Sequence, residues 1–389
     1  MNSVGTKSAA CLKRIVLGRS PAGAWSRGMA GESAGLGLGE VVAALGDFAP
    51  ASLAESWDNV GLLVEPATPR PVRKALLTID LTEAVMREAL GLSVDLIVAY
   101  HPPIFAPLKS VTSRTWKERL IASCLENRIA VYSPHTSYDA KVGGVNDWLA
   151  AAFETKCTKP LIQSFKRSSF THRVDFTFLK GEDVTSSGFL QALRARGPAP
   201  EGSAWRARHT FETGTTTHLT VECPSSQLAL VTETFTDLLP ENTSSCMSIA
   251  KVEEEPLPGH GMGRLCELQA PVTVRGAVSL VKQHVGVPHV RLALAAGGDM
   301  DSEVRSVAVC AGSGGAVLRG ACADLWLTGE MQHHDVLEAT QGGAHVVLCN
   351  HSDSERGFLG RLAPQLCRLL RGQVAFLVAA SDRDPLATV

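Results

Sequence analysis

Short apolar runs alternate with helix-like segments in the first part of the chain, from residue 38 to about 153. In the helix-like segments apolar residues recur every three to four positions, which is the spacing of one helix face. The predicted elements are a strand at KALLTID (74–80), a helix at TEAVMREALG (82–91), a strand at DLIVAYH (95–101), a helix at TWKERLIASCLENR (115–128) and a strand at IAVYSPH (129–135). Helices of this length between strands favour right-handed crossovers, so we expect a largely parallel sheet.

The segment from about residue 155 to 258 has a different pattern. Its predicted elements are strands at 172–179, 217–223 and 246–254 and helices near 183–196 and 225–239. Together they suggest a small strand-helix-strand-strand-helix-strand unit, a ferredoxin/PII-like α+β domain. Polar or glycine-rich stretches, KRSS (166–169) and PLPGHGMG (256–263), flank it. We interpret 155–258 as an inserted domain.

The α/β alternation resumes in the last part of the chain. Strands are predicted at VRSVAVC (304–310), ADLWLTG (323–329), HVVLCNH (345–351) and QVAFLVAA (373–380), with helices at MQHHDVLEAT (331–340) and ERGFLGRLAPQLCRLL (355–370). The predicted fold class is therefore α/β, with a two-lobed, mixed or parallel-sheet core. An N-terminal lobe (38–154) and a C-terminal lobe (259–389) form this core, and the insert interrupts it.

Composition is that of an ordinary globular protein. Apolar residues make up 45% and charged residues 20% of the 389 residues, and the net charge is -2. The near-neutral charge argues against direct nucleic-acid contact. No run approaches the ~18 apolar residues of a membrane helix, so we expect no membrane partner. Ten cysteines lie far apart, several of them inside apolar runs, which predicts reduced, buried thiols.

Residues 1–30 are basic and rich in serine and alanine, with no acid before Glu32. This bias is typical of a mitochondrial transit peptide. A basic tail ahead of a second start at Met29 explains it equally well, and both interpretations stay open.

Polar side chains follow several of the predicted strands. They are His101, His135, Asp139, Glu330, His351 and Glu355. The carboxyl ends of parallel strands open on one rim of a sheet, where ligands bind, so these groups can converge. His351 and Glu355 are four residues apart at a helix start and can face a common ion.

From this pattern we predict a metal site among these histidines and carboxylates. Imidazole and carboxylate ligands suit zinc, iron or manganese, with one or two ions present. The alternative for each single histidine is a structural role with its hydrogen bonds satisfied within the core.

Glu330 and His334 are predicted to serve in proton transfer, because residues four apart share a helix face. For the adjacent pair His333 and His334, pocket lining or substrate contact is the first interpretation, and electrostatic stabilisation of the helix start and direct ligation are alternatives. The glycine turn AGSGG (311–315) fits either an anion cradle or a tight strand-to-helix connection.

Seven ordered motifs resemble one known family. They are SWDNVGLLVE (56–65), YHPPIF (100–105), YSPHTSYDA (132–140), GMGRLCEL (261–268), VAVCAGSGG (307–315), LTGEMQHHDVLEA (327–339) and HSDSERGFL (351–359). Together they are similar to the NIF-three-like family (Ngg-one-interacting factor three), also called the GTP cyclohydrolase I type 2 family. The resemblance spans residues 38–389 outside the insert and is greatest to vertebrate members.

The resemblance implies a two-lobed fold with an insert, and rings of dimers around a di-metal pocket in bacterial relatives. The family's paired histidines fall on Tyr100 and His101, its aspartate on Asp139, and its late His and Glu on His351 and Glu355. The resemblance therefore implies His101, Asp139, His351 and Glu355 as the metal ligands. Tyr100 departs from the pattern, because a phenol with a pKa of about 10 is a poor ligand at neutral pH. A single-ion site is therefore a second interpretation, with His135 as a substitute ligand.

Two functions follow as hypotheses. The first is a metal-dependent hydrolase of a nucleotide-like or phosphorylated small molecule. The second is a non-enzymatic transcriptional co-regulator that acts through protein partners, as the family name implies. The resemblance also predicts a homodimer and a cytoplasmic and nuclear location, with a mitochondrial form if residues 1–30 are a transit peptide.

Overall fold

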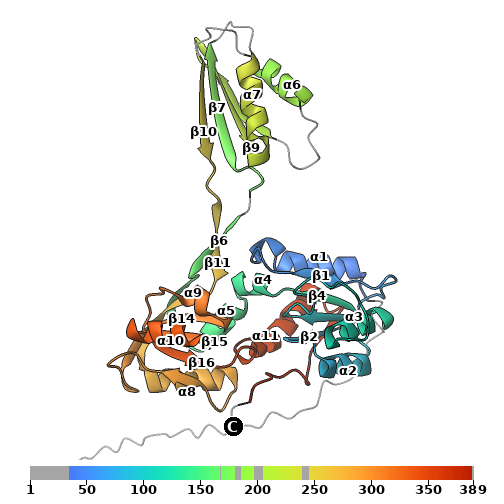
Figure 1. Cartoon of the computed structure of the whole chain (residues 1–389), viewed down its shortest axis with the longest axis vertical. Helices are drawn as coiled ribbons and strands as arrows, with labels where there is room; N and C mark the ends of the chain where they lie inside the picture. Colours follow the sequence, from blue (N-terminus) through green and yellow to red (C-terminus); the bar gives the residue numbers. More distant parts are fainter. Residues whose placement is uncertain (1–34, 167, 180–184, 197–204, 239–244, 388–389) are drawn as a thin grey trace, which may run out of the picture.

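The computed structural model of the chain describes residues 35–166, 168–179, 185–196, 205–238 and 245–387. The basic extension at 1–30, with both of its interpretations, lies outside the described residues. Two α/β lobes lie side by side, and a third domain stands away from them on a narrow stalk (Figure 1). The predicted two-lobed α/β fold with an inserted α+β domain is confirmed.

The N-terminal lobe is built on a five-stranded sheet. Its strand order is β1 (Gly61–Val64), β4 (Ala130–Ser133), β3 (Leu96–Ala99), β2 (Lys74–Thr78) and β17 (Ala375–Val378). The β1–β4 pair is antiparallel and the other neighbouring pairs are parallel. The helices that complete the lobe are α1 (Leu38–Phe48), α2 (Glu83–Leu92), α3 (Trp116–Glu126), α4 (Thr136–Ala140) and α5 (Val145–Ala150), with a 3-10 turn at Ala51–Leu53.

Local signals place these helices where the periodicity predicts them. Thr82 caps α2 by accepting a hydrogen bond from the Val85 amide. At α3, Thr115 and Glu118 form a capping box, in which each side chain accepts a hydrogen bond from the other's backbone amide. The first turns of both helices therefore follow strand ends directly, and the loops that carry polar residues stay short.

The C-terminal lobe is built on a six-stranded sheet. Its strand order is β13 (Arg291–Ala293), β16 (His345–Leu348), β15 (Leu325–Glu330), β14 (Glu303–Ser313), β12 (Arg264–Thr273) and β5 (Thr155–Lys159). The β14–β15 and β15–β16 pairs are parallel and the others antiparallel. The helices are α8 (Val274–Val285), α9 (Gly315–Leu318), α10 (His333–Gln341) and α11 (Asp353–Leu369).

Two strands lie in the lobe opposite to the one expected from their sequence position. Residues 373–380, expected in the C-terminal lobe, contain β17, which pairs with β2 of the five-stranded sheet. Residues 155–159, expected in the insert, form β5, which pairs with β12 of the six-stranded sheet. In the case of β17, helix α11 crosses from β16 of the six-stranded sheet to the edge of the five-stranded sheet, where β17 pairs with β2.

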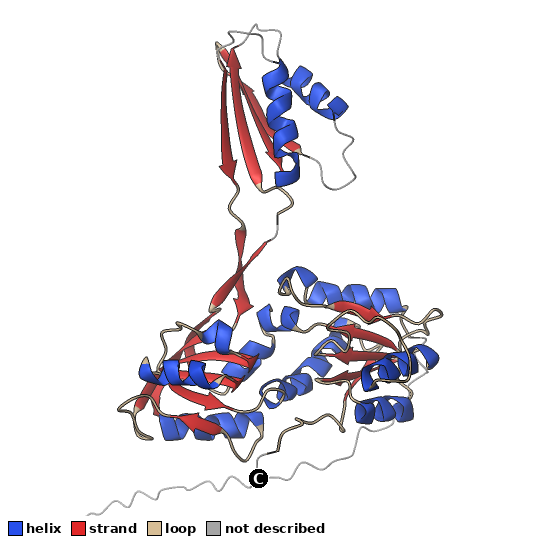
Figure 2. Ribbon diagram, in the orientation of Figure 1, coloured by secondary structure: helices blue, strands red, loops and turns tan. Residues whose placement is uncertain are grey.

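The insert has the strand order β10 (Ser245–Lys251), β7 (His172–Leu179), β9 (Thr216–Cys223) and β8 (Arg206–Glu212), all antiparallel. With α6 (Ser186–Arg196) and α7 (Leu228–Leu238) on one face, this is the predicted ferredoxin-like arrangement. Its own core includes Phe176, Phe189 and Phe235. The stalk is the antiparallel pair β6 (Ile162–Lys166) and β11 (Glu255–Met262) (Figure 2).

One buried cluster of apolar side chains joins the two lobes. It includes Leu77 and Tyr138 of the N-terminal lobe, Leu327 of the six-stranded sheet and Phe358 of α11. Burying a large apolar side chain stabilises a fold by about 1.5–3 kcal/mol, so this shared core fixes the lobes against each other. The described helices are too short or too polar to cross a bilayer. The described cysteines include buried free thiols, as predicted for Cys124, Cys310 and Cys349, but also exposed ones at Cys157, Cys246 and Cys322.

Candidate metal centre

The carboxyl ends of two different sheets meet between the lobes. His101 follows β3 of the five-stranded sheet, and His351 follows β16 of the six-stranded sheet. Glu355 lies in the first turns of α11, the helix that crosses between the lobes. The sequence analysis placed these groups on the rim of one sheet, whereas the structure draws them from two.

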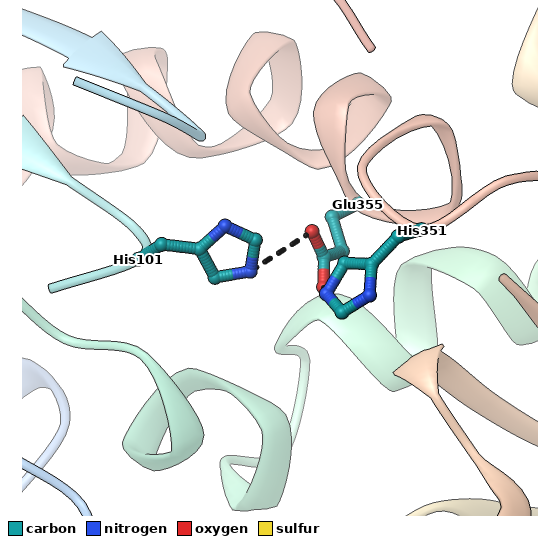
Figure 3. Close-up of side chains that lie close together, drawn as sticks. All are labelled: His101, His351 and Glu355. Atoms are coloured by element: carbon teal, nitrogen blue, oxygen red, sulfur yellow. Dashed lines mark ion pairs between the residues drawn. The ribbon is translucent and has the colours of Figure 1, made fainter. Parts of the chain in front are cut away.

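His101, His351 and Glu355 form a compact cluster (Figure 3). One nitrogen of each imidazole and one oxygen of the carboxylate all lie within 4.8 Å of one another. The Nε2 atom of His101 is 3.4 Å from Glu355 Oε2, and the Nε2 atom of His351 is 3.5 Å from Glu355 Oε1. Two imidazoles and a carboxylate in this arrangement can bind a divalent cation.

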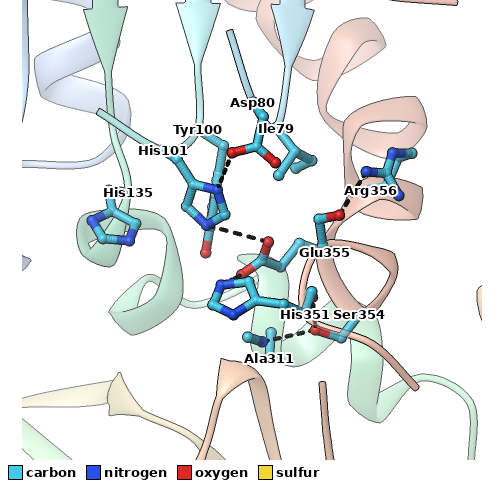
Figure 4. Close-up of polar contacts among 12 residues, drawn as sticks. Ile79, Asp80, Tyr100, His101, His135, Ala311, His351, Ser354, Glu355 and Arg356 are labelled. Atoms are coloured by element: carbon cyan, nitrogen blue, oxygen red, sulfur yellow. Dashed lines mark hydrogen bonds and ion pairs between the residues drawn. The ribbon is translucent and has the colours of Figure 1, made fainter. Parts of the chain in front are cut away.

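A second layer of carboxylates orients both imidazoles, and Figure 4 shows one of these carboxylates, Asp80, beside His101. Asp80, after β2, lies 2.9 Å from the Nδ1 atom of His101, and Glu330, at the end of β15, lies 2.9 Å from the Nδ1 atom of His351. Each carboxylate accepts a hydrogen bond from the Nδ1–H group of its histidine. In that tautomer the lone pair of Nε2 points at the cluster. Carboxylate support of this kind is typical of histidines that bind metal ions.

The electrostatics of His101 are dominated by its acidic neighbours. Burial alone would lower the pKa of His101, but Glu355 and Asp80 outweigh it and raise that pKa to about 10. Burial likewise opposes the lowering of the Asp80 pKa, which the hydrogen bond to His101 brings about. The cluster therefore stabilises positive charge, and a bound cation can take the place of the imidazolium proton.

Two observations test whether the pocket fits an ion. The Oε2 atom of Glu355 is buried and accepts no hydrogen bond of normal geometry from the described residues, although His101 Nε2 lies 3.4 Å away; an ion or water between the two would satisfy it. Gly312 has a φ of +67°, and a Cβ atom at this position would lie 2.7 Å from Glu355 Oε1 and 3.2 Å from His351 Nε2. The missing side chain leaves space beside the ligand atoms, so the residues fit a metal ion.

Asp139, the fourth predicted ligand, is not among the three clustered residues. It is half-buried at the cavity wall and accepts a hydrogen bond from the Tyr100 hydroxyl. Burial raises the pKa of Asp139 to about 6, although the Tyr100 hydrogen bond opposes the change. Burial also raises the pKa of Tyr100 well above its ordinary value, so Tyr100 stays a neutral phenol. Tyr100 thus satisfies the aspartate instead of offering a ligand.

His135 stands beside the cluster, and its ring centroid is 5.3 Å from that of His101. Its Nδ1 atom lies 2.7 Å from Asp58 Oδ1, and Asp58 also accepts hydrogen bonds from the Thr136 amide and hydroxyl. Burial alone would raise the pKa of Asp58, but the bonds from His135 and Thr136 lower it. These bonds hold His135 at a φ of +32°, which is strained for a non-glycine residue.

The two residues predicted for proton transfer differ in their surroundings. Glu330 contacts the Nδ1 atom of His351, and its part in proton transfer stays a prediction. His334 is exposed in the first turn of α10, and its ring contact among the described residues is with His333. Asp80 and Asp58 are absent from the sequence-based prediction. Asp80 ends the KALLTID strand, so the strand-end rule applied to that strand would have found it.

The cluster opens into a cavity of about 460 Å³. Its lining combines His351, Glu355, Asp139 and His135 with apolar side chains, among them Trp57, Phe105, Ile162 and Met262. A cavity of this size accommodates a small molecule.

Comparison with known proteins identifies the family of this chain. The family model described as Duf34/NIF3 (NGG1p interacting factor 3) matches residues 36–385. The chain belongs to the NIF3 family. NIF3-like protein 1 of Rattus norvegicus is 44% identical over 358 residues, with 90% of this chain and 93% of the relative covered. NGG1-interacting factor 3 of Saccharomyces cerevisiae is 30% identical, with 90% of this chain and 96% of the relative covered.

Solved structures of similar proteins share the fold. A Bacillus cereus protein related to NIF3 superimposes with a TM-score of 0.63 at 25% identity, with 90% of this chain and 98% of that chain covered. A Staphylococcus aureus protein gives a TM-score of 0.66 at 22% identity, with 91% and 99% covered. The predicted membership of the NIF3 family is therefore confirmed.

Proposed function

We propose that this protein binds a divalent cation through His101, His351 and Glu355 and hydrolyses a small, nucleotide-like molecule in the adjoining cavity. The observation that carries the proposal is the pair of imidazoles whose Nδ1 atoms are held by Asp80 and Glu330 while their Nε2 atoms converge on Glu355. A cation held there would supply positive charge that polarises the scissile bond and promotes ionisation of water.

The chain's own groups have separable tasks. Asp80 and Glu330 keep the rings in the ligating orientation, so that little reorganisation accompanies binding. Tyr100 donates to Asp139 and keeps that carboxyl out of the three-residue cluster, which favours one ion over two. His135, whose ring is fixed by Asp58, lines the cavity and is available to hydrogen-bond a substrate.

Elemental analysis of the full chain tests whether the protein binds a metal ion. We expect wild type to retain about one zinc, iron or manganese ion per chain and to lose thermal stability on chelation, because a ligand that binds only the folded state stabilises it. At an ion concentration 100 times Kd the stabilisation is about 2.7 kcal/mol. His351→Ala should contain less metal and show no response to chelator, whereas His289→Ala, an exposed histidine, should behave as wild type.

Activity measurements test whether the protein is a hydrolase. Screening nucleotides and their analogues with wild type and His351→Ala should find a reaction that the variant loses. Equal metal content and equal turnover in both proteins would refute the proposal.

A second candidate is an adaptor that binds protein partners, and the stalked insert favours it. The insert has its own core and projects from the lobes (Figure 1), and the yeast relative is named an NGG1-interacting factor. Lys166 and Glu255 lie opposite each other in the stalk, so Asn-Gly in place of residues 167–254 closes it as a hairpin. Under this proposal the shortened chain loses a partner that wild type captures, and unchanged capture would exclude the insert as the interface.

A further inference from the structure

Two large aromatic side chains stand exposed at the mouth of the metal-centre cavity. Trp57 is 60% exposed and Phe105 is 51% exposed, yet both line the cavity that contains His351 and Glu355. Their ring centroids are 6.0 Å apart in an edge-to-face arrangement, and Trp57 packs in the same way against His135 at 6.0 Å. Exposed apolar side chains that gather at a pocket typically mark a binding surface.

The backbone holds this aromatic pair in place. Asn59, two residues after Trp57, donates a 2.5 Å hydrogen bond to the carbonyl of Ile104, the residue before Phe105. Asp58 binds the Thr136 amide, and the Glu55 amide binds the Thr136 hydroxyl, so the Trp57 loop is fixed on both sides. The rings are therefore positioned before any ligand arrives, which lowers the entropy lost on binding.

The charges of the cavity exclude one kind of ligand. Three carboxylates, Glu55, Asp139 and Glu355, and two histidines line it, and no lysine or arginine is among the described lining residues. Sites for a nucleoside triphosphate surround the phosphates with lysine, arginine or several amides at a helix start. The glycine turn at 311–315 also borders the cavity, but the helix that follows it, α9, has only four residues and offers no extended row of amides. A chain of phosphates would therefore meet mainly carboxylates at this wall of the cavity.

We propose that Trp57 and Phe105 determine specificity by stacking on a planar aromatic ring of the substrate, while a polar group of the same molecule reaches the His101–His351–Glu355 cluster. The ring is a nucleobase or a similar heterocycle, and the substrate carries no polyphosphate chain. This inference rests on the proposed function for the second contact, and the aromatic contact stands on its own. Stacking on an aromatic side chain strengthens binding by about tenfold per ring.

Two hydroxamates measure the ring contact on the zinc-loaded full chain. Acetohydroxamate and benzohydroxamate carry the same metal-binding group, and only the second carries a ring. By calorimetry we expect benzohydroxamate to bind about tenfold more tightly. Trp57→Ala and Phe105→Ala should each reduce this ratio several-fold without changing the affinity for acetohydroxamate, and Trp57→Phe should preserve most of it.

The control for surface tryptophan loss is Trp116→Ala, since Trp116 is 46% exposed and is not among the residues that line the cavity. It should leave both affinities unchanged. Equal binding of the two hydroxamates by wild type, or an unchanged ratio in Trp57→Ala, would overturn the inference and leave the metal site intact. Failure to retain zinc would instead count against the proposed function.

If the protein does not retain zinc, an experiment without metal still tests the aromatic contact. Adenosine and ATP are titrated into chelator-treated wild type and Trp57→Ala. We expect adenosine to bind wild type more tightly than ATP does, and Trp57→Ala to weaken adenosine binding about tenfold. Tighter binding of ATP, or no effect of the variant, would refute the inference, as would dissociation of an oligomer in Trp57→Ala by light scattering, because the pair would then be a subunit interface.

Discussion

Gly312 controls the space around the ligand atoms. Its φ of +67° lies in the left-handed region, and an added Cβ would press on Glu355 and His351. We predict that Gly312→Ala lowers metal affinity at least tenfold, measured by zinc titration. Gly320→Ala is the matched control: its φ is +77°, but a Cβ there would meet nothing within 4 Å. Both variants share a backbone strain of about 1 kcal/mol, so equal zinc affinity in the two would contradict the steric argument.

Glu88 of α2 anchors the chain beyond β17 in a pH-dependent way. It accepts hydrogen bonds from the Ala380 and Ser381 amides and from the Ser381 hydroxyl. Burial alone would raise the pKa of Glu88, but these hydrogen bonds outweigh it and lower the pKa below its ordinary 4.5. The stabilisation is therefore complete above pH 4.5 and is lost as pH falls through the lowered pKa.

Glu88→Gln should cost about 1 kcal/mol of unfolding free energy at pH 7, allowing for solvent screening. Denaturant unfolding between pH 3 and 7 should show the gap to wild type closing at the acid end. Glu126→Gln, on the exposed end of α3, should match wild type throughout. A gap for Glu88→Gln that persisted at pH 3 would argue against the carboxylate as its source.

The sequence predicted the ligand residues better than the residues that support them. His101, His351 and Glu355 follow strands whose apolar runs are plain in the sequence, so their convergence could be inferred. The contact of Tyr100 with Asp139 depends on the depth of burial, which no spacing encodes. Trp57 and Phe105 look like core residues in the sequence, and their exposure became visible only in the structure.

At the scale of elements, helix α11 depends on a close approach to α5. A Cβ atom added at Gly357 would lie 2.2 Å from the ring of Trp148, which is 6% exposed. We predict that Gly357→Ala lowers the free energy of unfolding by about 1–3 kcal/mol, because the overpacked ring must move and this outweighs the gain in helix propensity.

Gly360→Ala in the same helix provides the comparison. A Cβ there has nothing within 4 Å, so the change should stabilise the protein by up to about 1 kcal/mol. Urea unfolding of both variants measures the two effects. A stabilised Gly357→Ala would show that Trp148 has room to move.

Most elements, though not their partners, follow from the periodicity. The predicted strands β2 to β4, and three of the four strands and both helices of the insert, match the structure within a few residues, whereas β8 had no predicted range. The short strands β1, β5 and β13 were not predicted, because an edge strand of three to five residues gives little alternation. The pairing of β17 with β2 depends on where α11 leads, which local pattern does not reveal.

At the scale of the whole molecule, the lobes form one unit and the insert another. The lobes share a core, whereas only the stalk strands link the insert to them. We predict that the chain with Asn-Gly in place of residues 167–254 keeps the metal content of wild type and melts within a few degrees of it. Elemental analysis and calorimetry check this, and loss of the ion would mean that the insert supports the centre. The homodimer remains a prediction.

The swap of β17 into the first sheet has a consequence for biosynthesis. The ribosome makes β2 long before it makes β17, the strand that covers the open edge of β2. Until then the nascent lobe presents unpaired backbone groups that other chains can bind, which is a hazard for aggregation. Because α11 carries Glu355 and leads into β17, the step that closes this edge also delivers the ligand, and a truncated chain has neither.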